Sequence, residues 1–168
     1  MIESIRVDDR LIHGQVALVW TKEFNARHIV IANDKAANDK IAQMTLEMAT
    51  PSGIKLLIKS VSDSIAVFND ERIKDTPLFV LTANISDALF IAENCELKSI
   101  NVANVGRFDD SDDTEDMEDK IKLSPQIFVN QKEMSALKKL VTMDLDVHNQ
   151  IVPSDQKKNI KTLLKNYL

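Results

Sequence analysis

The chain has 168 residues, a single cysteine and a formal net charge of −5. A chain of this length can bury a stable core as one domain, residues 1–168, while one cysteine excludes an internal disulfide and favours a reducing compartment. The first residues contain no apolar signal-peptide core, and no run reaches the roughly 18 apolar residues of a spanning helix. We therefore expect a soluble, cytoplasmic protein.

Apolar runs of strand length alternate with segments of helical periodicity. The first predicted strand, Ile2–Val7, precedes an apolar stripe whose i, i+3, i+4, i+8 spacing predicts a helix, made by Val16, Val19, Trp20 and Phe24. The other predicted strands are His28–Ala32, Ile54–Lys59, Leu78–Thr82, Ser99–Ala103, Ile127–Val129 and Leu145–Val152. The other predicted helices are Asn38–Ala49, Ser62–Phe68, Ser86–Glu93, Gln131–Val141 and Ser154–Tyr167. This alternation predicts an α/β fold, a mainly parallel sheet with helices on both faces.

Turn residues separate these elements. Pro51-Ser52-Gly53 predicts a helix-to-strand turn, whereas the segments 84–87 and 153–155 have the capping side chains of helix starts. In open α/β sheets, ligands bind beyond the carboxyl ends of the strands. The loops at that edge are Asp8–Gly14, Asn33–Asp34, Lys59–Ser62, Ala83–Ser86 and Asn104–Arg107. Only the first of these loops concentrates titratable groups.

That first loop lies within the stretch RVDDRLIHGQV, residues 6–16, and contains a histidine at the mouth of the first helix. Neutral imidazole is a competent nucleophile near neutral pH, so His13 is the candidate acceptor of a phosphoryl group. Arg6 and Arg10 could neutralise that group with forked hydrogen bonds, and amides at the helix entrance would add partial positive charge.

The other residues of the stretch have supporting roles in this interpretation. Asp8 or Asp9 could accept from one ring nitrogen and leave the other free to attack, and the sequence does not decide between the two aspartates. Gly14 would let the backbone approach closely. The plainer alternative is that the aspartates cap the helix and pair with the arginines on the surface, and physical reasoning alone gives the two interpretations about equal weight.

Several other functions are disfavoured by the sequence. His28 and His148 lie in predicted strands and are expected to be structural, no histidine–cysteine cluster has the spacing of a metal site, and no glycine-rich nucleotide motif occurs. We therefore expect no metal, no cofactor and no nucleic acid. A response-regulator receiver is excluded because the third predicted strand ends without an aspartate and the fifth leads into no lysine.

The stretch 6–16 resembles the signature of a known family, the IIB component of the mannose/fructose/sorbose class of the bacterial sugar phosphotransferase system (PTS). The resemblance continues through residues 49–53, 81–87, 100–108 and 152–155, and so covers essentially the whole chain. It implies an open, doubly wound, mainly parallel sheet. It also implies a phosphohistidine relay in which a phosphorylated IIA component donates to the IIB histidine, which passes the group to a sugar entering through membrane components IIC and IID.

Carried over residue by residue, His13 matches the phosphorylated histidine, Arg10 the arginine three before it, and Arg6 and Asp8 the flanking members of the motif. The candidate phosphate- or partner-binding residues are Gly14, Gln15, Asn84, Asn104 and Arg107. We expect a cytoplasmic protein peripherally associated with the membrane permease complex. The alternative is a phosphorylation-sensitive regulatory or binding protein of the same fold that delivers no phosphate to sugar.

One segment, Asp109–Asp119, carries eight of the 26 acidic residues and no basic residue, leaving 18 acids against 21 bases elsewhere. Such a run is typical of a solvated loop, and it lacks the glycine of an EF-hand calcium loop. Because it would repel phosphate beside a phosphoryl site, we expect it to point away or to contact a basic partner surface.

Overall fold

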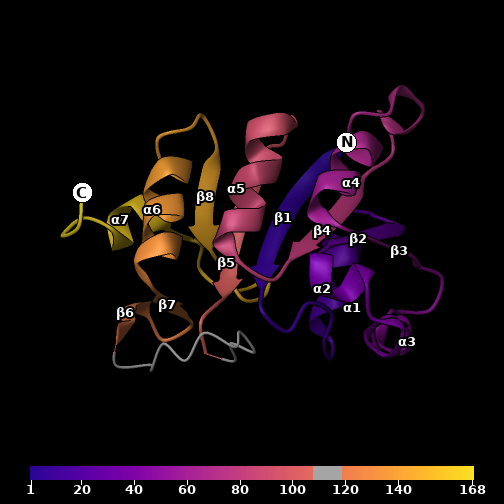
Figure 1. The fold of residues 1–168 in the computed structure, drawn as a ribbon, viewed down its shortest axis with the longest axis horizontal. Coiled ribbons are helices and arrows are strands. Elements are labelled where there is room, and N and C mark those ends of the chain that lie inside the picture. Colours follow the sequence, from indigo (N-terminus) through magenta and orange to yellow (C-terminus); the bar gives the residue numbers. More distant parts are fainter. Residues whose placement is uncertain (108–118) are drawn as a thin grey trace.

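The computed structural model describes residues 1–107 and 119–168. Seven strands form one sheet in the order β3-β2-β4-β1-β5-β8-β9 (Figure 1). Their bounds are β1 Ile2–Asp8, β2 His28–Ala32, β3 Lys55–Lys59, β4 Leu78–Thr82, β5 Ser99–Asn104, β8 Asp146–Asn149 and β9 Lys158–Asn159. All neighbouring pairs are parallel except β8 and β9, so the predicted mainly parallel sheet is confirmed.

Helices cover both faces of this sheet. The helices are α1 Val16–Glu23, α2 Asp34–Ala37, α3 Lys40–Ala49, α4 Val61–Phe68, α5 Ile85–Asn94, α6 Gln131–Leu140 and α7 Ile160–Leu163, with a 3₁₀ turn at Glu71–Ile73. One buried cluster joins α1, α2 and α3 to β2 and β4, and a larger one joins α4, α5 and α6 to the opposite face. The doubly wound arrangement follows from this division.

Strand β1 lies at the centre of the sheet, and six of its seven residues are buried. From its carboxyl end the chain runs through α1 toward β2 on one side, whereas the chain leaving β5 returns as β8 on the other side. Strand order therefore reverses between β1 and β5. Open α/β sheets bind ligands at such a reversal, so the fold places residues 9–15 at the expected position of a site.

The C-terminal part of the chain differs from the prediction. Helix α7 covers only Ile160–Leu163, and the predicted helix start at 153–155 is wrong because Gln150 Nε2 donates to the carbonyls of Pro153 and Asp155 and holds a turn there. Residues Lys158–Asn159 instead pair antiparallel with β8. The Asn159 side chain then caps α7 by accepting from the amide of Lys161 at 2.8 Å.

Two further predictions are corrected around the sheet. The predicted strand Ile127–Val129 is confirmed as β7, but it forms an antiparallel hairpin with β6, Ile121–Ser124, which was not predicted, and meets the chain after β5 through a parallel bridge between Ile127 and Val105. The predicted helix Asn38–Ala49 is preceded by a separate short helix, α2, because the Asp39 side chain accepts from the amides of Ile41 and Ala42 and starts α3 afresh. The predicted start of α5 is confirmed, since the Asn84 side chain accepts from the amide of Asp87.

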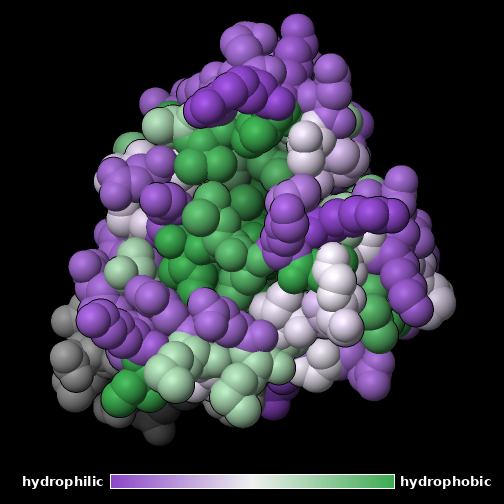
Figure 2. Space-filling view, turned by 90° about the vertical axis from the view of Figure 1, so that its right-hand side faces the viewer, coloured by the Kyte–Doolittle hydropathy of each residue, from purple (hydrophilic) through white to green (hydrophobic). Residues whose placement is uncertain are grey.

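The edge of the molecule formed by β3 and α3 carries exposed apolar side chains. Figure 2 shows a broad apolar area on this face. Its members on α3 and β3 are Ile41, Met44, Met48 and Leu57. Among the residues that the structure describes, no helix is long and apolar enough to cross a membrane.

Candidate functional site

The loop between β1 and α1 fixes the position of His13. Leu11 and Gly14 both have positive φ, 58° and 50°, so the loop turns sharply on each side of His13. A non-glycine residue in this region costs about 1–3 kcal/mol, which the surrounding structure must offset. Part of this offset comes from Ile12, which is 5% exposed and packs into the buried cluster that contains α1. The histidine is thereby held at the carboxyl edge of the central strand.

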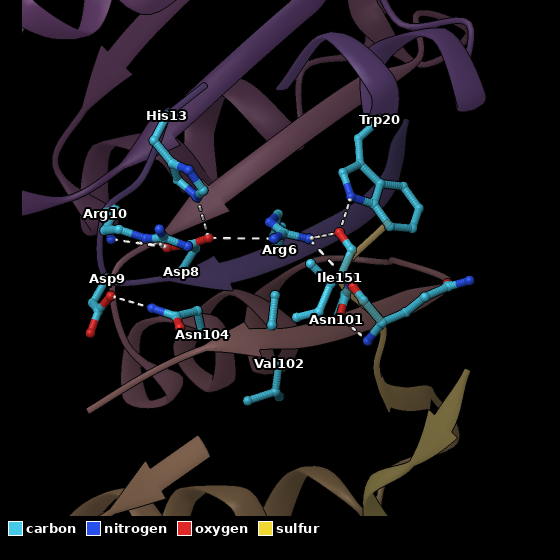
Figure 3. Close-up of polar contacts among 12 residues, drawn as sticks. Arg6, Asp8, Asp9, Arg10, His13, Trp20, Asn101, Val102, Asn104 and Ile151 are labelled. Atoms are coloured by element: carbon cyan, nitrogen blue, oxygen red, sulfur yellow. Dashed lines mark hydrogen bonds and ion pairs between the residues drawn. The ribbon is translucent and has the colours of Figure 1, made fainter. Parts of the chain in front are cut away.

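His13 hydrogen-bonds a fully buried carboxylate. Its Nε2 lies 2.9 Å from Oδ2 of Asp8, the last residue of β1, and 24% of the His13 side chain remains accessible (Figure 3). A carboxylate is an acceptor, so Nε2 carries the proton and Nδ1 keeps its lone pair in the neutral ring. Of the two aspartates that the sequence left open, Asp8 is the one in contact with the histidine.

The two arginines of the motif bind the same carboxylate from different environments. Arg10 donates from its backbone amide and from Nε to Asp8 Oδ1 at 3.0 and 3.4 Å, with 43% of its side chain exposed. Arg6 is only 2% exposed, and its Nη2 lies 3.4 Å from Asp8 Oδ2. Burial lowers the pKa of the Arg6 guanidinium, and the negative charge of Asp8 opposes that shift. Arg10 is therefore the arginine accessible to an incoming anion, and Arg6 a buried support of Asp8.

We expect Arg6→Met to destabilise the fold far more than Arg10→Met. Removing Arg6 leaves the buried Asp8 carboxylate without its buried counter-ion, a loss of about 3–5 kcal/mol. Arg10 is exposed and screened, and its loss should cost about 1 kcal/mol or less. Urea unfolding of both variants at pH 7 measures the difference, and equal losses would contradict the assignment of Arg6 as the supporting charge.

Asp9 contacts the neighbouring strand instead of the histidine. Its amide donates to the carbonyl of Asn104 at 3.0 Å, and the Asn104 side chain donates back to Asp9 Oδ1 at 2.8 Å. These bonds join the end of β1 to the end of β5 across the reversal of strand order. Asp9 and Asn104 thus hold the start of the loop against the end of β5.

The remaining predicted site residues lie around this edge of the sheet. Gly14 and Gln15 are exposed at the start of α1, and Arg107 is exposed just beyond β5. Asn84 lies at the end of β4 and donates to Asp87 Oδ2 at 3.1 Å while capping α5. Binding of phosphate or a partner by these residues stays a prediction. The acidic segment predicted at 109–119 lies outside the described residues except for Asp119.

A second group of carboxylates lies at the start of α5. Burial, with the charges of Asp34 and Glu133, raises the pKa of Asp87 to about 6, although the Asn84 side chain opposes the shift. The Glu133 carboxylate accepts from the amides of Ile85 and Ser86 at 2.7 and 3.2 Å. This helix start is therefore already occupied by a side chain of the same protein.

We expect Asp87→Asn to raise the free energy of unfolding at pH 7. The folded pKa of about 6 lies above the ordinary 3.8, so the contribution of this group to stability is present below pH 4 and is lost as the pH rises through 6. After a discount for partial exposure, the gain should be about 1–2 kcal/mol at pH 7 and small at pH 4. Urea unfolding at both pH values measures it. Asp63→Asn, at the matching position of α4, is the control, and a loss of stability in both variants at pH 7 would contradict the expectation.

Sequence reasoning missed the residues that hold Arg6 in place. Arg6 Nη1 donates to the carbonyls of Gln150 and Ile151 at 3.4 and 3.1 Å. Trp20 Nε1 donates to the same Ile151 carbonyl at 3.0 Å, and Asn101 binds the backbone of Gln150 (Figure 3). One signal existed in the sequence, since Asn101 is a polar residue inside an apolar strand and a buried amide needs partners.

The structure also locates the other two histidines. His148 is buried in β8 with Nδ1 3.3 Å from Asp146 Oδ2, and burial lowers its pKa. His28 begins β2 at the opposite, amino edge of the sheet. Within residues 1–107 and 119–168, no group of three or more His, Cys, Asp or Glu side chains could hold a metal ion.

Fold and site together define a class: an open α/β protein with an accessible histidine, oriented by a buried carboxylate, at the reversal of strand order. Comparison with known proteins narrows that class. The family model described as the PTS system sorbose subfamily IIB component matches residues 2–167. The chain belongs to this family.

Individual relatives agree along the whole chain. A probable phosphotransferase enzyme IIB component of Streptococcus pyogenes serotype M6 is 52% identical over 98% of this chain and 99% of its own length. The mannose-specific EIIAB component of Escherichia coli K12 is 28% identical over 98% of this chain and 48% of its own length. The crystal structure of the IIBSor domain of the Klebsiella pneumoniae sorbose permease superposes with a TM-score of 0.87 at 27% identity, covering 100% of this chain and 98% of that one. The predicted fold class and family are thus confirmed.

Proposed function

We propose that this phosphotransferase-system IIB component carries the phosphoryl group on Nδ1 of His13. The observation that supports the proposal is the 2.9 Å contact between His13 Nε2 and the buried Asp8 carboxylate, because it leaves Nδ1 as the free nucleophile. The Nδ1 lone pair forms a bond to phosphorus as the bond between phosphorus and the donor breaks. Arg10 and the amides at the start of α1 are placed to neutralise the phosphoryl oxygens.

The proposed donor is a phosphorylated IIA component, and the proposed acceptor is a sugar bound by membrane components IIC and IID. The Escherichia coli relative, an EIIAB component of which this chain spans about half, supports pairing with IIA. In the second transfer, the sugar hydroxyl oxygen bonds to phosphorus and releases its proton to water, while the bond between phosphorus and Nδ1 breaks and its electron pair returns to Nδ1. The protein would act in the cytoplasm, peripherally associated with the membrane components IIC and IID. The relatives' names favour this role over the regulatory alternative. Because one relative is named sorbose-specific and another mannose-specific, family membership specifies the chemistry and not the sugar.

Reconstitution of the phosphate chain tests the proposal. Radiolabelled phosphoenolpyruvate, the general phosphotransferase proteins and a cognate IIA component should label this protein, and ³¹P NMR should identify Nδ1-phosphohistidine. Membranes carrying IIC and IID should then remove the label in the presence of sugar. Label on another residue would overturn the assignment of His13, and label that never reaches sugar would support the regulatory alternative.

A further inference from the structure

We infer that the turn after β8 is part of the phosphoryl site, and that Asn101 is a positioning residue which holds the His13 ring through Gln150, Ile151, Arg6 and Asp8. This inference rests on the proposed role of His13. The residues involved come from β1, α1, β5 and the end of β8, and Figure 3 shows them as one connected set of polar contacts.

Asn101 hydrogen-bonds the backbone at the residue where the chain leaves β8. Its Nδ2 donates to the carbonyl of Gln150 at 2.7 Å, and its Oδ1 accepts from the amide of the same residue at 3.0 Å. The side-chain amide thus replaces the backbone partner that a continuing strand would have. Asn101 is 2% exposed, so these bonds are shielded from water. They fix where the carbonyls of residues 150 and 151 point.

Those carbonyls receive the Arg6 guanidinium. Arg6 lies opposite Asn101 in the β1–β5 register, so both side chains project from the same face of the sheet. Arg6 Nη1 donates to both carbonyls, and the indole of Trp20 on α1 donates to the same Ile151 carbonyl. A buried guanidinium requires acceptors for its donors, and the turn supplies those of Nη1. The orientation of Arg6 therefore depends on the turn.

Arg6 in turn sets the Asp8 carboxylate. Asp8 Oδ2 is shared by Arg6 Nη2 and His13 Nε2, at 3.4 and 2.9 Å. If the turn moves, Arg6 loses its acceptors and shifts against Asp8, and the carboxylate no longer meets His13 in one geometry. The ring could then rotate or place its proton on Nδ1, which would remove the nucleophile. This sequence of contacts makes Asn101 important to the tautomer of His13 without any contact between the two.

The test measures the tautomer and the transfer rate together. ¹⁵N-histidine NMR of the full chain distinguishes Nδ1–H from Nε2–H for each of the 3 histidines, and loss of one signal in His13→Gln assigns His13. We expect wild-type His13 to carry its proton on Nε2. Asn101→Ala should produce a detectable Nδ1–H population and lower the rate of phosphorylation by IIA about 10–100-fold per folded molecule. Trp20→Phe, which keeps an aromatic ring, should cause a smaller change in the same direction.

Two controls separate positioning from general loss of stability. Leu137→Ala in α6 removes a fully buried side chain from the opposite core and should lower stability without changing the tautomer or the rate per folded molecule. In an Asp8→Asn background, Asn101→Ala should lower the rate little further, because both changes act through the same carboxylate. Additive losses, or an unchanged tautomer and rate in both Asn101→Ala and Trp20→Phe, would overturn the inference. A wild-type protein that takes no label on His13 would instead overturn the proposed function.

Discussion

His13→Ala should take no label from a phosphorylated IIA component, a loss of at least about 10³-fold. The lost imidazole is the proposed nucleophile, and the nearby Asp8 and Arg10 side chains cannot replace it in forming a phosphoramidate. The fold should persist, because Asp8 keeps Arg6 and Arg10 as partners, with a stability cost of about 1–2 kcal/mol for the lost hydrogen bond. Labelling kinetics and urea unfolding of the same preparation measure the two quantities.

His28→Asn is the matched control for this variant. His28 lies at the amino edge of the sheet, away from the loop of residues 9–15, so its replacement should leave labelling unchanged. Full labelling of His13→Ala, or equal loss in both variants, would contradict the assignment of His13 as the acceptor.

Asp8→Asn should slow phosphorylation of His13 on the order of 10²–10⁴-fold per folded molecule. An asparagine amide facing Nε2 would donate to it, so the ring proton would move to Nδ1 and occupy the nucleophilic position. The variant should also lose about 3–5 kcal/mol of stability, because Arg6 would be left buried without its counter-ion. Rates are therefore measured at low temperature and normalised to the folded fraction, with ¹⁵N-histidine NMR reporting the tautomer.

Asp9→Asn is the matched control, because it removes the same negative charge as Asp8→Asn from the next residue of the chain. Asp9 contacts Asn104 and the β5 backbone and not the histidine, so this variant should keep the wild-type tautomer and lose far less activity. Equal effects of the two substitutions would show that net charge in the loop, and not the Asp8–His13 contact, controls the reaction.

Local patterns in the sequence predicted most of the sheet and the position of the loop. The strands Leu78–Thr82 and His28–Ala32 were predicted at their observed bounds because buried parallel strands are continuous apolar runs. The C-terminal prediction failed for a tertiary reason. The run Leu145–Val152 was predicted as one strand, but β8 covers only Asp146–Asn149, because the Asn101 side chain hydrogen-bonds the backbone of Gln150. No local propensity contains that contact, since its partners lie 49 residues apart.

The sequence by itself determined the chemistry of the site: a histidine, two arginines and two aspartates adjacent to a helix start, within a motif that resembles one family. Only the tertiary structure decided how the charges are divided. It buried Arg6 and exposed Arg10, paired Asp8 with His13 and Asp9 with Asn104, and brought Gln150 and Ile151 into contact with Arg6. Residue types are local information, whereas burial and hydrogen-bond partners depend on which strands become neighbours, and that is settled only when the sheet assembles.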